Sequence, residues 1–383
     1  MRICVAYDCL YPWTVGGAER WARNLAEALA ADGHDVTYIT RLQWDPADPP
    51  RLPGVRVLAV APAEPLYGPD GNRRISQALR FGRGVLGHLL RHGREYDRVH
   101  FQASPYFGVL AAGVARRLGG RFSLAVDWAE VWSDHYWNVY LGGLRGRVAG
   151  AVQRAAIRVR HDAFCFSELH ARRLREQGLR GDVTVLRGLA DLPPGRPTPR
   201  DAEPLVVFAG RHIPEKHAPD VVPAVLEARR RIPELRAVIF GDGPQLEDVR
   251  AAIAAHGAQD VISAPGFADE ETVADTLARA TCLLLPSVRE GYGMIVIEAA
   301  AKGVPSVLVR AEDNSSTDHI VEGVNGFVAP DLSPRALADG IVATWEGGPA
   351  LREATADWYA ANARELSMQT SLHRVTARYA ATS

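Results

Sequence analysis

Long apolar runs are missing from this chain of 383 residues. No uncharged apolar segment reaches the roughly 18 residues that mark a membrane-spanning helix, and Asp8 stands where a secretory signal needs an apolar core. We therefore expect a cytoplasmic protein without a membrane span. Cysteine is scarce as well and shows no Cys-x-x-Cys spacing, so neither a disulfide framework nor a zinc site is expected. The cysteines are Cys4, Cys9, Cys165 and Cys282.

Lysine is almost absent from the chain, and the usual dinucleotide-binding motif is missing. The first predicted loop contains only Gly16-Gly17 in place of Gly-x-Gly-x-x-Gly, which argues against a dinucleotide oxidoreductase. Lys216 and Lys302 are the two lysines among 44 basic residues. Lys216 is therefore notable as a compact charge of the kind that binds phosphate. Lys302 follows a predicted helix, where a plain solvated cation is the favoured interpretation.

Charge is unevenly distributed, although the net charge of the whole chain is −1. Residues 1–190 contain 26 arginines against 18 acidic residues, whereas the remainder contains 18 basic against 27 acidic residues. A basic half suits an anionic ligand, a lipid surface or nucleic acid. Arg147, Arg154 and Arg158 fall on nearly one helical face. Because the composition is rich in arginine, a solvated helix is favoured over a membrane-surface helix. No recognition motif accompanies the arginines, so we expect no nucleic-acid partner.

Alternating strand and helix patterns run through both halves and predict doubly wound α/β domains. A proline-rich linker over 189–204 separates a domain over 1–188 from one over 205–359. A C-terminal helix over about 360–383 is expected to pack back on the first domain. In the first half, apolar runs predict strands at 2–7, 35–40, 55–60, 98–102, 123–126 and 163–166. Helical patterns lie at 18–31, 75–90, 106–118 and 168–177.

One strand–loop–helix unit in the second half has the pattern of a ligand site. The run 282–285 predicts a buried strand, and 294–302 predicts a helix. The loop between them should open at the carboxyl end of a parallel strand, where ligands bind. Glu290 in this loop could hold a sugar hydroxyl, and Glu298 could hold a vicinal diol. Two unremarkable acids, one on the surface and one in a first helical turn, are the alternative.

Six ordered segments resemble a known family, the retaining glycosyltransferases of the GT-B fold, specifically family 4. They are YPWTVGGAER at 11–20, FAGRHIPEK at 208–216, FGDGP at 240–244, Pro265–Phe267, EGYGMIVIEA at 290–299 and EGVNGFVAP at 322–330. A single motif of this kind is weakly specific, whereas six in order over nearly the whole chain are strongly specific. The resemblance implies an α/β protein of two Rossmann-like domains facing across a cleft.

The resemblance also implies roles for residues that bind a nucleotide-sugar donor. Arg211 and Lys216 are expected at the pyrophosphate, Glu290 at the transferred sugar and Glu298 at the ribose, and Arg211, Lys216 and Glu290 form the expected catalytic group. Fixed cations would stabilise the charge that develops on the departing diphosphate. No Asp-x-Asp triplet is present, so neither a metal nor another cofactor is expected. The further donor-binding candidates are Gly16, Gly17, Gly241, Phe267, Gly291, Tyr292, Gly293, Met294 and Ile295.

The first domain is expected to recognise the acceptor. Trp128, Trp132 and Tyr136 are spaced for one helical face. Such an aromatic wall suits a sugar or an amine-bearing small molecule, and a helix packed on the core is the equally weighted alternative. The acceptor candidates are Tyr11, Trp13, His100, Asp127, Glu130 and Trp132.

Some positions depart from the family pattern. Relatives often have histidine where this chain has Gln102 and Asp127, which leaves any histidine-based role open. They commonly have glycine where this chain has His217.

These patterns predict an enzyme that moves a sugar from a UDP- or GDP-linked donor to a hydroxyl of a small-molecule, natural-product or saccharide acceptor. The departing phosphate is expected to assist proton removal. Alternatives are a lipid-linked or polysaccharide acceptor at a membrane surface, a nucleotide-sugar epimerase on the same fold, and a silent nucleotide-sugar-binding protein. Peripheral membrane contact is not favoured. A silent binder is expected to lose Arg211, Lys216 or Glu290, and all three are present.

Overall fold

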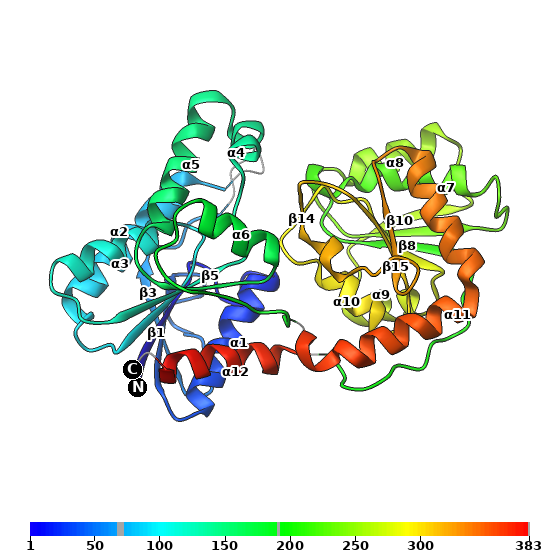
Figure 1. Ribbon diagram of the computed structural model, residues 1–383. Helices are drawn as coiled ribbons and strands as arrows, with labels where there is room; N and C mark the ends of the chain where they lie inside the picture. Colours follow the sequence, from blue (N-terminus) through cyan, green and yellow to red (C-terminus); the bar gives the residue numbers. More distant parts are fainter. Residues whose placement is uncertain (67–72, 190–191, 382–383) are drawn as a thin grey trace. The chain divides into compact units, whose positions relative to one another are not determined.

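A computed structural model describes residues 1–66, 73–189 and 192–381. The chain divides into two compact units, one of Met1–Leu189 with Ser371–Ser383 and one of Ala190–Thr370 (Figure 1). Positions 190–191 of the predicted linker and 382–383 of the predicted C-terminal helix lie outside the described residues. None of the helices in the described ranges is long and apolar enough to cross a membrane.

The N-terminal unit is built on a seven-stranded parallel sheet of order β3-β2-β1-β4-β5-β6-β7. Helices cover the sheet, so most of its strand residues are buried, including several polar ones. The strands are β1 (Arg2–Ala6), β2 (Asp35–Arg41), β3 (Val55–Ala61), β4 (Arg98–Gln102), β5 (Ser123–Trp128), β6 (Asp162–Cys165) and β7 (Val183–Val185). The helices are α1 (Gly17–Ala31), α2 (Ile75–His92), α3 (Phe107–Arg117), α4 (Asp134–Leu141), α5 (Gly143–Ile157) and α6 (Glu168–Glu176).

The C-terminal unit repeats this architecture with a six-stranded parallel sheet of order β10-β9-β8-β11-β13-β15. A separate parallel pair joins β12 (Arg289–Glu290) to β14 (Asp313–Asn314). The main strands are β8 (Leu205–Ala209), β9 (Arg236–Phe240), β10 (Ile262–Gly266), β11 (Cys282–Leu285), β13 (Ser306–Val309) and β15 (Gly326–Ala329). The helices are α7 (Val221–Ala228), α8 (Leu246–Ala255), α9 (Glu270–Arg279), α10 (Met294–Ala300) and α11 (Pro334–Leu366). The predicted doubly wound fold class is confirmed.

The last helix, α12 (Met368–Ala381), packs on the N-terminal unit from Ser371 onward. Ser371 Oγ accepts a hydrogen bond from the Gly188 amide at 3.0 Å. Arg378 forms an ion pair with Asp162 at 2.8 Å. The end of the chain is therefore held by contacts to residues far earlier in the sequence.

The predicted helical face through Trp128, Trp132 and Tyr136 is wrong. Trp128 is the last residue of β5, and α4 begins only at Asp134. The side chain of Ser133 accepts a hydrogen bond from the Tyr136 amide and so fixes the start of α4. The spacing of four between the aromatic residues therefore spans a strand, a loop and a helix.

His161 gives the N-terminal unit a pH-dependent stability. The indole of Trp128 donates to His161 Nε2 at 3.0 Å, and His161 Nδ1 lies 2.5 Å from the carbonyl of Val159, so the folded chain favours a neutral ring. Burial lowers the pKa of His161 from 6.5 to about 4. The unfolded chain binds the proton first, so stability should fall as the pH drops from 6.5 to 4, by up to about 1.4 kcal/mol per pH unit.

Urea unfolding across this pH range measures the effect. His161→Gln, which cannot titrate, should unfold with a shallower dependence on pH than the unmodified chain. Some dependence should remain, because burial also lowers the pKa of His88 to about 4. Identical slopes for the two proteins would contradict the assignment to His161.

Candidate functional site

The C-terminal unit gathers the predicted donor residues in loops that follow parallel strands. Arg211 and Lys216 follow β8, Gly241 follows β9, Phe267 follows β10 and Glu290 follows β11. The carboxyl ends of parallel strands lie at one edge of a sheet, which is where ligands bind in such folds. These loops, which are far apart in the sequence, therefore lie at one edge of the sheet.

Lys216 and Glu290 form an ion pair at this edge. Lys216 Nζ donates to Glu290 Oε1, and the side chains are only 17% and 10% exposed. The carbonyl of Glu290 accepts from Ser315 Oγ at 2.8 Å, which fixes the backbone of β12. A second ion pair joins their sequence neighbours, Arg289 and Glu215, at 3.2 Å. The lysine is therefore a fixed cation beside a fixed carboxylate.

Two glycines allow the backbone to approach closely here. Gly241 has a φ of 129°, and a Cβ on it would lie 1.8 Å from the carbonyl oxygen of Gly210. Gly293 has a φ of 84°, and a Cβ on it would lie 2.4 Å from Ser316 Cβ. Any side chain at either position would collide and strain the backbone.

His217 occupies the position where relatives commonly have glycine, and its backbone explains that preference. It has a φ of 52° and a ψ of 37°. Histidine is among the residues that enter this left-handed region most readily. His217 Nδ1 lies 2.7 Å from Asp220 Oδ2, a contact that holds the side chain of this turn.

The other predicted donor residues differ in their exposure. Arg211 is exposed and makes no side-chain hydrogen bond or ion pair among the described residues, and Phe267 is 82% exposed. Tyr292 is buried against His319, with ring centroids 4.7 Å apart. Half-buried positions are occupied by Gly291, Met294, Ile295 and Glu298.

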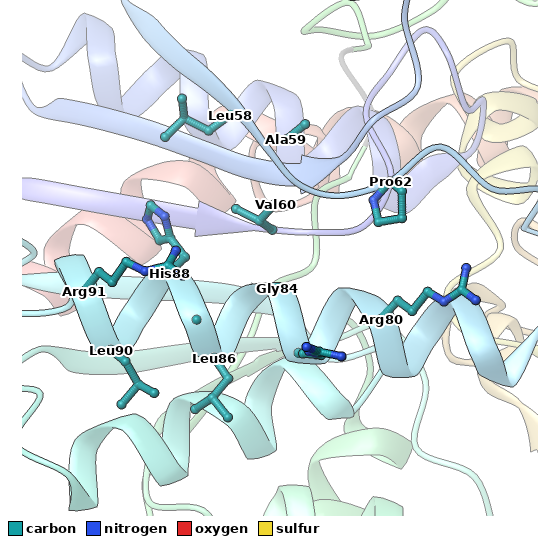
Figure 2. A pocket seen from close by; sticks show the side chains of 12 residues that line it. Leu58, Ala59, Val60, Pro62, Arg80, Gly84, Leu86, His88, Leu90 and Arg91 are labelled. Atoms are coloured by element: carbon teal, nitrogen blue, oxygen red, sulfur yellow. The ribbon is translucent and has the colours of Figure 1, made fainter.

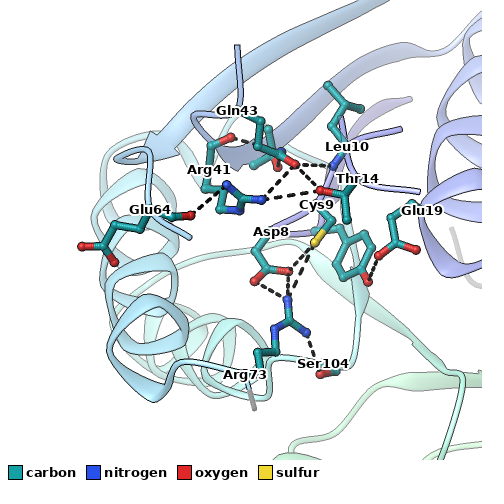
Figure 3. A network of polar contacts seen from close by, with 12 residues as sticks. Asp8, Cys9, Leu10, Thr14, Glu19, Arg41, Gln43, Glu64, Arg73 and Ser104 are labelled. Carbon is teal, nitrogen blue, oxygen red and sulfur yellow. Dashed lines mark hydrogen bonds and ion pairs between the residues drawn. The ribbon is translucent and has the colours of Figure 1, made fainter. Parts of the chain in front are cut away.

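Figure 3 shows a polar network around Asp8, which follows β1 in the N-terminal unit. Both oxygens of the buried Asp8 carboxylate accept from Arg73 Nη2, at 2.6 and 2.5 Å. The neighbouring Arg41 donates to the carbonyl of Glu64 at 3.1 Å. Burial raises the pKa of the Cys9 thiol well above its ordinary value, so this cysteine is inert within the network.

The loop after β1 leads into the Gly16-Gly17 pair and exposes aromatic side chains. Gly17 is the first residue of α1, and a Cβ on Gly16 would lie 2.3 Å from Glu19 Oε2. Tyr11 lies beneath two arginines, with the guanidinium of Arg20 5.4 Å and that of Arg23 5.8 Å from the ring centroid.

Trp13 in the same loop is 43% exposed. Its ring meets that of Trp44 edge to face, with centroids 6.1 Å apart. Trp44 lies in the loop after β2, and a hydrogen bond of 2.8 Å from Thr14 to Gln43 joins the two loops beside this ring pair.

His100 and Asp127 lie fully buried at 0% exposure. Asp127 Oδ2 accepts from Trp21 Nε1 at 2.7 Å and from Gln102 Nε2 at 2.5 Å. His100 Nε2 lies 2.8 Å from Asp127 Oδ1 but is not aligned for a hydrogen bond, and His100 Nδ1 pairs with the hydroxyl of Tyr379. Asp127 therefore holds the side chains of Trp21 and Gln102 in place, and His100 holds that of Tyr379.

Glu130 and Trp132 lie in the loop between β5 and α4. The indole of Trp132 donates to Glu130 Oε2 at 2.6 Å. The Trp132 ring packs against those of Tyr136, Trp137 and Tyr140, with centroids 4.3 to 5.2 Å apart. Both side chains are half-buried, so their outer surfaces remain accessible.

Two family profiles match consecutive parts of the sequence. One described as Glycosyltransferase Family 4 matches residues 15–193, and one described as Glycosyl transferases group 1 matches residues 195–361. The chain belongs to glycosyltransferase family 4. It is a glycosyltransferase of a retaining family that uses nucleotide sugars, so the predicted family and enzyme class are confirmed.

Individual proteins are similar to this chain in sequence or in fold. An α-D-kanosaminyltransferase of Streptomyces kanamyceticus is 30% identical over 157 residues, which cover 41% of this chain and 40% of that protein. Glycogen synthase of Mycobacterium tuberculosis is 26% identical over 372 residues, covering 88% of this chain and 84% of that enzyme. A crystal structure of Anabaena HepE in complex with UDP is similar in fold, with a TM-score of 0.76, 16% identity and full coverage of both chains.

Sequence reasoning missed several residues of this glycosyltransferase that surround the candidate site residues. Tyr379 contacts His100 across 279 positions, and Arg73 contacts Asp8 across 65. Neither pairing has a local signal in the sequence. Trp44 could have been found, because an aromatic residue shortly after a predicted parallel strand lies at the edge where ligands bind.

Proposed function

We propose that the chain transfers a sugar, with retention, from a nucleotide-diphosphate sugar to a hydroxyl of a small-molecule, natural-product or saccharide acceptor. The observation that carries this proposal is the ion pair of Lys216 with Glu290 at the carboxyl edge of the C-terminal sheet. It joins a fixed cation, which suits a diphosphate, to a carboxylate, which suits sugar hydroxyls. UDP is the preferred nucleotide, because Anabaena HepE was crystallised with it, and GDP is the second choice.

The proposed mechanism uses fixed charge at the departing group. Arg211 and Lys216 stabilise the negative charge that grows on the diphosphate as the glycosidic bond breaks. Glu290 accepts hydrogen bonds from the hydroxyls of the transferred sugar, and Glu298 accepts those of the ribose. The departing phosphate takes the proton of the incoming acceptor hydroxyl, so no protein base is required.

The N-terminal unit is the proposed site of acceptor recognition. Tyr11 and the exposed ring of Trp13 offer apolar faces beside polar groups, an arrangement that suits a sugar or cyclitol ring. Glu130 and Trp132 add a carboxylate next to an indole.

Thermal unfolding with a panel of nucleotides tests the donor assignment. A nucleotide present at about 100 times its Kd should stabilise the fold by about 2.7 kcal/mol. We expect UDP and UDP-sugars to raise the Tm most, followed by GDP and GDP-sugars. Ribose 5-phosphate is the control for nonspecific phosphate binding. A panel in which no nucleotide raises the Tm would overturn the proposed donor.

A further inference from the structure

Three helices of the N-terminal unit contain basic residues and no acidic residue. These are α2, α3 and α5, which together hold eight arginines. The chain as a whole has 45 acidic against 44 basic residues, so the absence of acidic residues from all three helices is unusual. Helix α3 contacts both α2 and α5, so the three form one layer (Figure 1).

Many of these arginines have no acidic partner. Arg83, Arg91, Arg117, Arg145 and Arg147 are exposed, and none forms an ion pair within the described ranges. By contrast, Arg80 pairs with Glu64 and Arg154 pairs with Asp134. The layer therefore presents a positive surface.

The same layer exposes large apolar side chains, between 40% and 75% of their surface. They come from all three helices and the residue that ends α3: Ile75, Leu79, Leu90, Val114, Leu118, Leu144 and Val148. By comparison, the exposed large apolar residues described in the C-terminal unit are Phe267 and Val321. Exposed apolar groups that coincide with unpaired arginines indicate an interaction surface.

A hollow of about 780 Å³ lies beside this layer, between α2 and the edge strand β3 (Figure 2). Its apolar wall includes Leu58, Val60 and Leu86, and Arg83 and Arg91 belong to its lining. Gly87 also lines it, and a Cβ on Gly87 would meet no atom within 4 Å. The hollow thus has an apolar interior next to cationic groups.

The sequence alone favours a solvated surface over a membrane contact, but the exposed apolar residues beside the arginines favour a membrane contact. We propose that the face formed by α2, α3 and α5 docks on an anionic phospholipid bilayer. Unpaired arginines attract the lipid headgroups, and the exposed leucine, isoleucine and valine side chains enter the headgroup–acyl boundary. Nucleic acid would match the arginines equally well but would leave the apolar side chains exposed to water. Docking does not depend on the proposed donor chemistry, because none of these residues belongs to the donor site.

Vesicle binding by the full chain tests this proposal. The protein should sediment with vesicles of phosphatidylcholine and phosphatidylglycerol and stay in solution with pure phosphatidylcholine. Each arginine near an anionic surface contributes roughly fivefold, so the double variant Arg83→Gln/Arg91→Gln should bind about 25-fold more weakly. Leu79→Ser/Leu90→Ser should also weaken binding, and this loss should persist at high salt because it removes apolar contact.

A matched double variant in the C-terminal unit controls for total charge. Arg335 and Arg364 are exposed on α11 and form no ion pair in the described part of the chain. Arg335→Gln/Arg364→Gln should bind vesicles like the unmodified chain. Equal loss in both charge variants, or no preference for phosphatidylglycerol, would overturn the proposal. Binding to a DNA duplex but not to anionic vesicles would overturn it in favour of nucleic acid.

Discussion

Lys216→Ala is expected to slow sugar transfer by a factor on the order of 10² to 10³, the usual cost of removing one fixed donor from a developing oxyanion. The side chain of Lys216 is 17% exposed and held by Glu290, so its charge is in place before the diphosphate departs. A preorganised cation stabilises the transition state without reorganisation at the moment of reaction. Steady-state kinetics with a UDP-sugar and a saccharide acceptor measures the loss.

Lys302→Ala is the matched control, because the sequence contains no other lysine. Lys302 follows α10 and forms no side-chain ion pair among the described residues. Its removal should leave both kcat and KM near those of the unmodified enzyme. Similar losses in the two variants would point to a general effect of lysine removal.

A structural role for Lys216 makes a different prediction from a catalytic one. If the ion pair only held the loop around Glu290, Lys216→Ala would lower the Tm and Lys216→Arg would restore turnover. If Lys216 contacts the diphosphate, kcat/KM should fall far more than the loss of Tm caused by the unpaired Glu290 carboxylate explains. Arginine should rescue only part of it, because a planar guanidinium does not replace a compact ammonium. Near-normal turnover of the alanine variant would remove Lys216 from the site.

The strands of both sheets were largely predictable from the sequence. The predicted strands at 98–102 and 282–285 coincide with β4 and β11. Both strands are fully buried. β11 is a continuous apolar run that ends where the strand ends, whereas β4 also buries the polar residues Arg98, His100 and Gln102. A continuous apolar run such as β11 can therefore be recognised as a buried parallel strand from the local sequence.

The segment 127–140 shows where local patterns fail. Its aromatic residues recur every four positions, yet Trp128 completes β5 while Tyr136 lies on α4. Trp128 is fully buried and packs on Tyr106, whereas the half-buried Trp132 packs on Trp137. Periodicity reports burial but does not distinguish one buried element from two.

The pairing of Lys216 with Glu290 could be predicted only in part from the sequence. The two residues are 74 positions apart, and composition alone does not join them. Alternating strands and helices predict that both loops lie at the same edge of one sheet, which narrows the possible partners. The parallel pairing of β12 with β14 then fixes the carboxylate, and nothing local in the sequence predicts that pairing.

Asp127→Ala is expected to lower the free energy of unfolding by about 2 to 6 kcal/mol, because each of the two buried donors left without an acceptor costs about 1 to 3 kcal/mol. The carboxylate is 0% exposed and accepts from the indole of Trp21 and the amide of Gln102. Alanine would leave both donors buried without an acceptor. Asp134→Ala is the matched control, because this acid is 72% exposed and its pairing with Arg154 should contribute at most about 1 kcal/mol.

Asp127→Asn separates the structural role of this carboxylate from a chemical one. Asparagine keeps the shape and one acceptor oxygen, but its amide group faces donors, so the loss of stability should be about 1 to 3 kcal/mol. Because Asp127 is buried beside His100, we expect the folded fraction of this variant to turn over at nearly the unmodified rate. Urea unfolding gives the folded fraction, and initial rates per folded molecule give the turnover. A large loss of rate per folded molecule would assign Asp127 a part in the chemistry that its burial argues against.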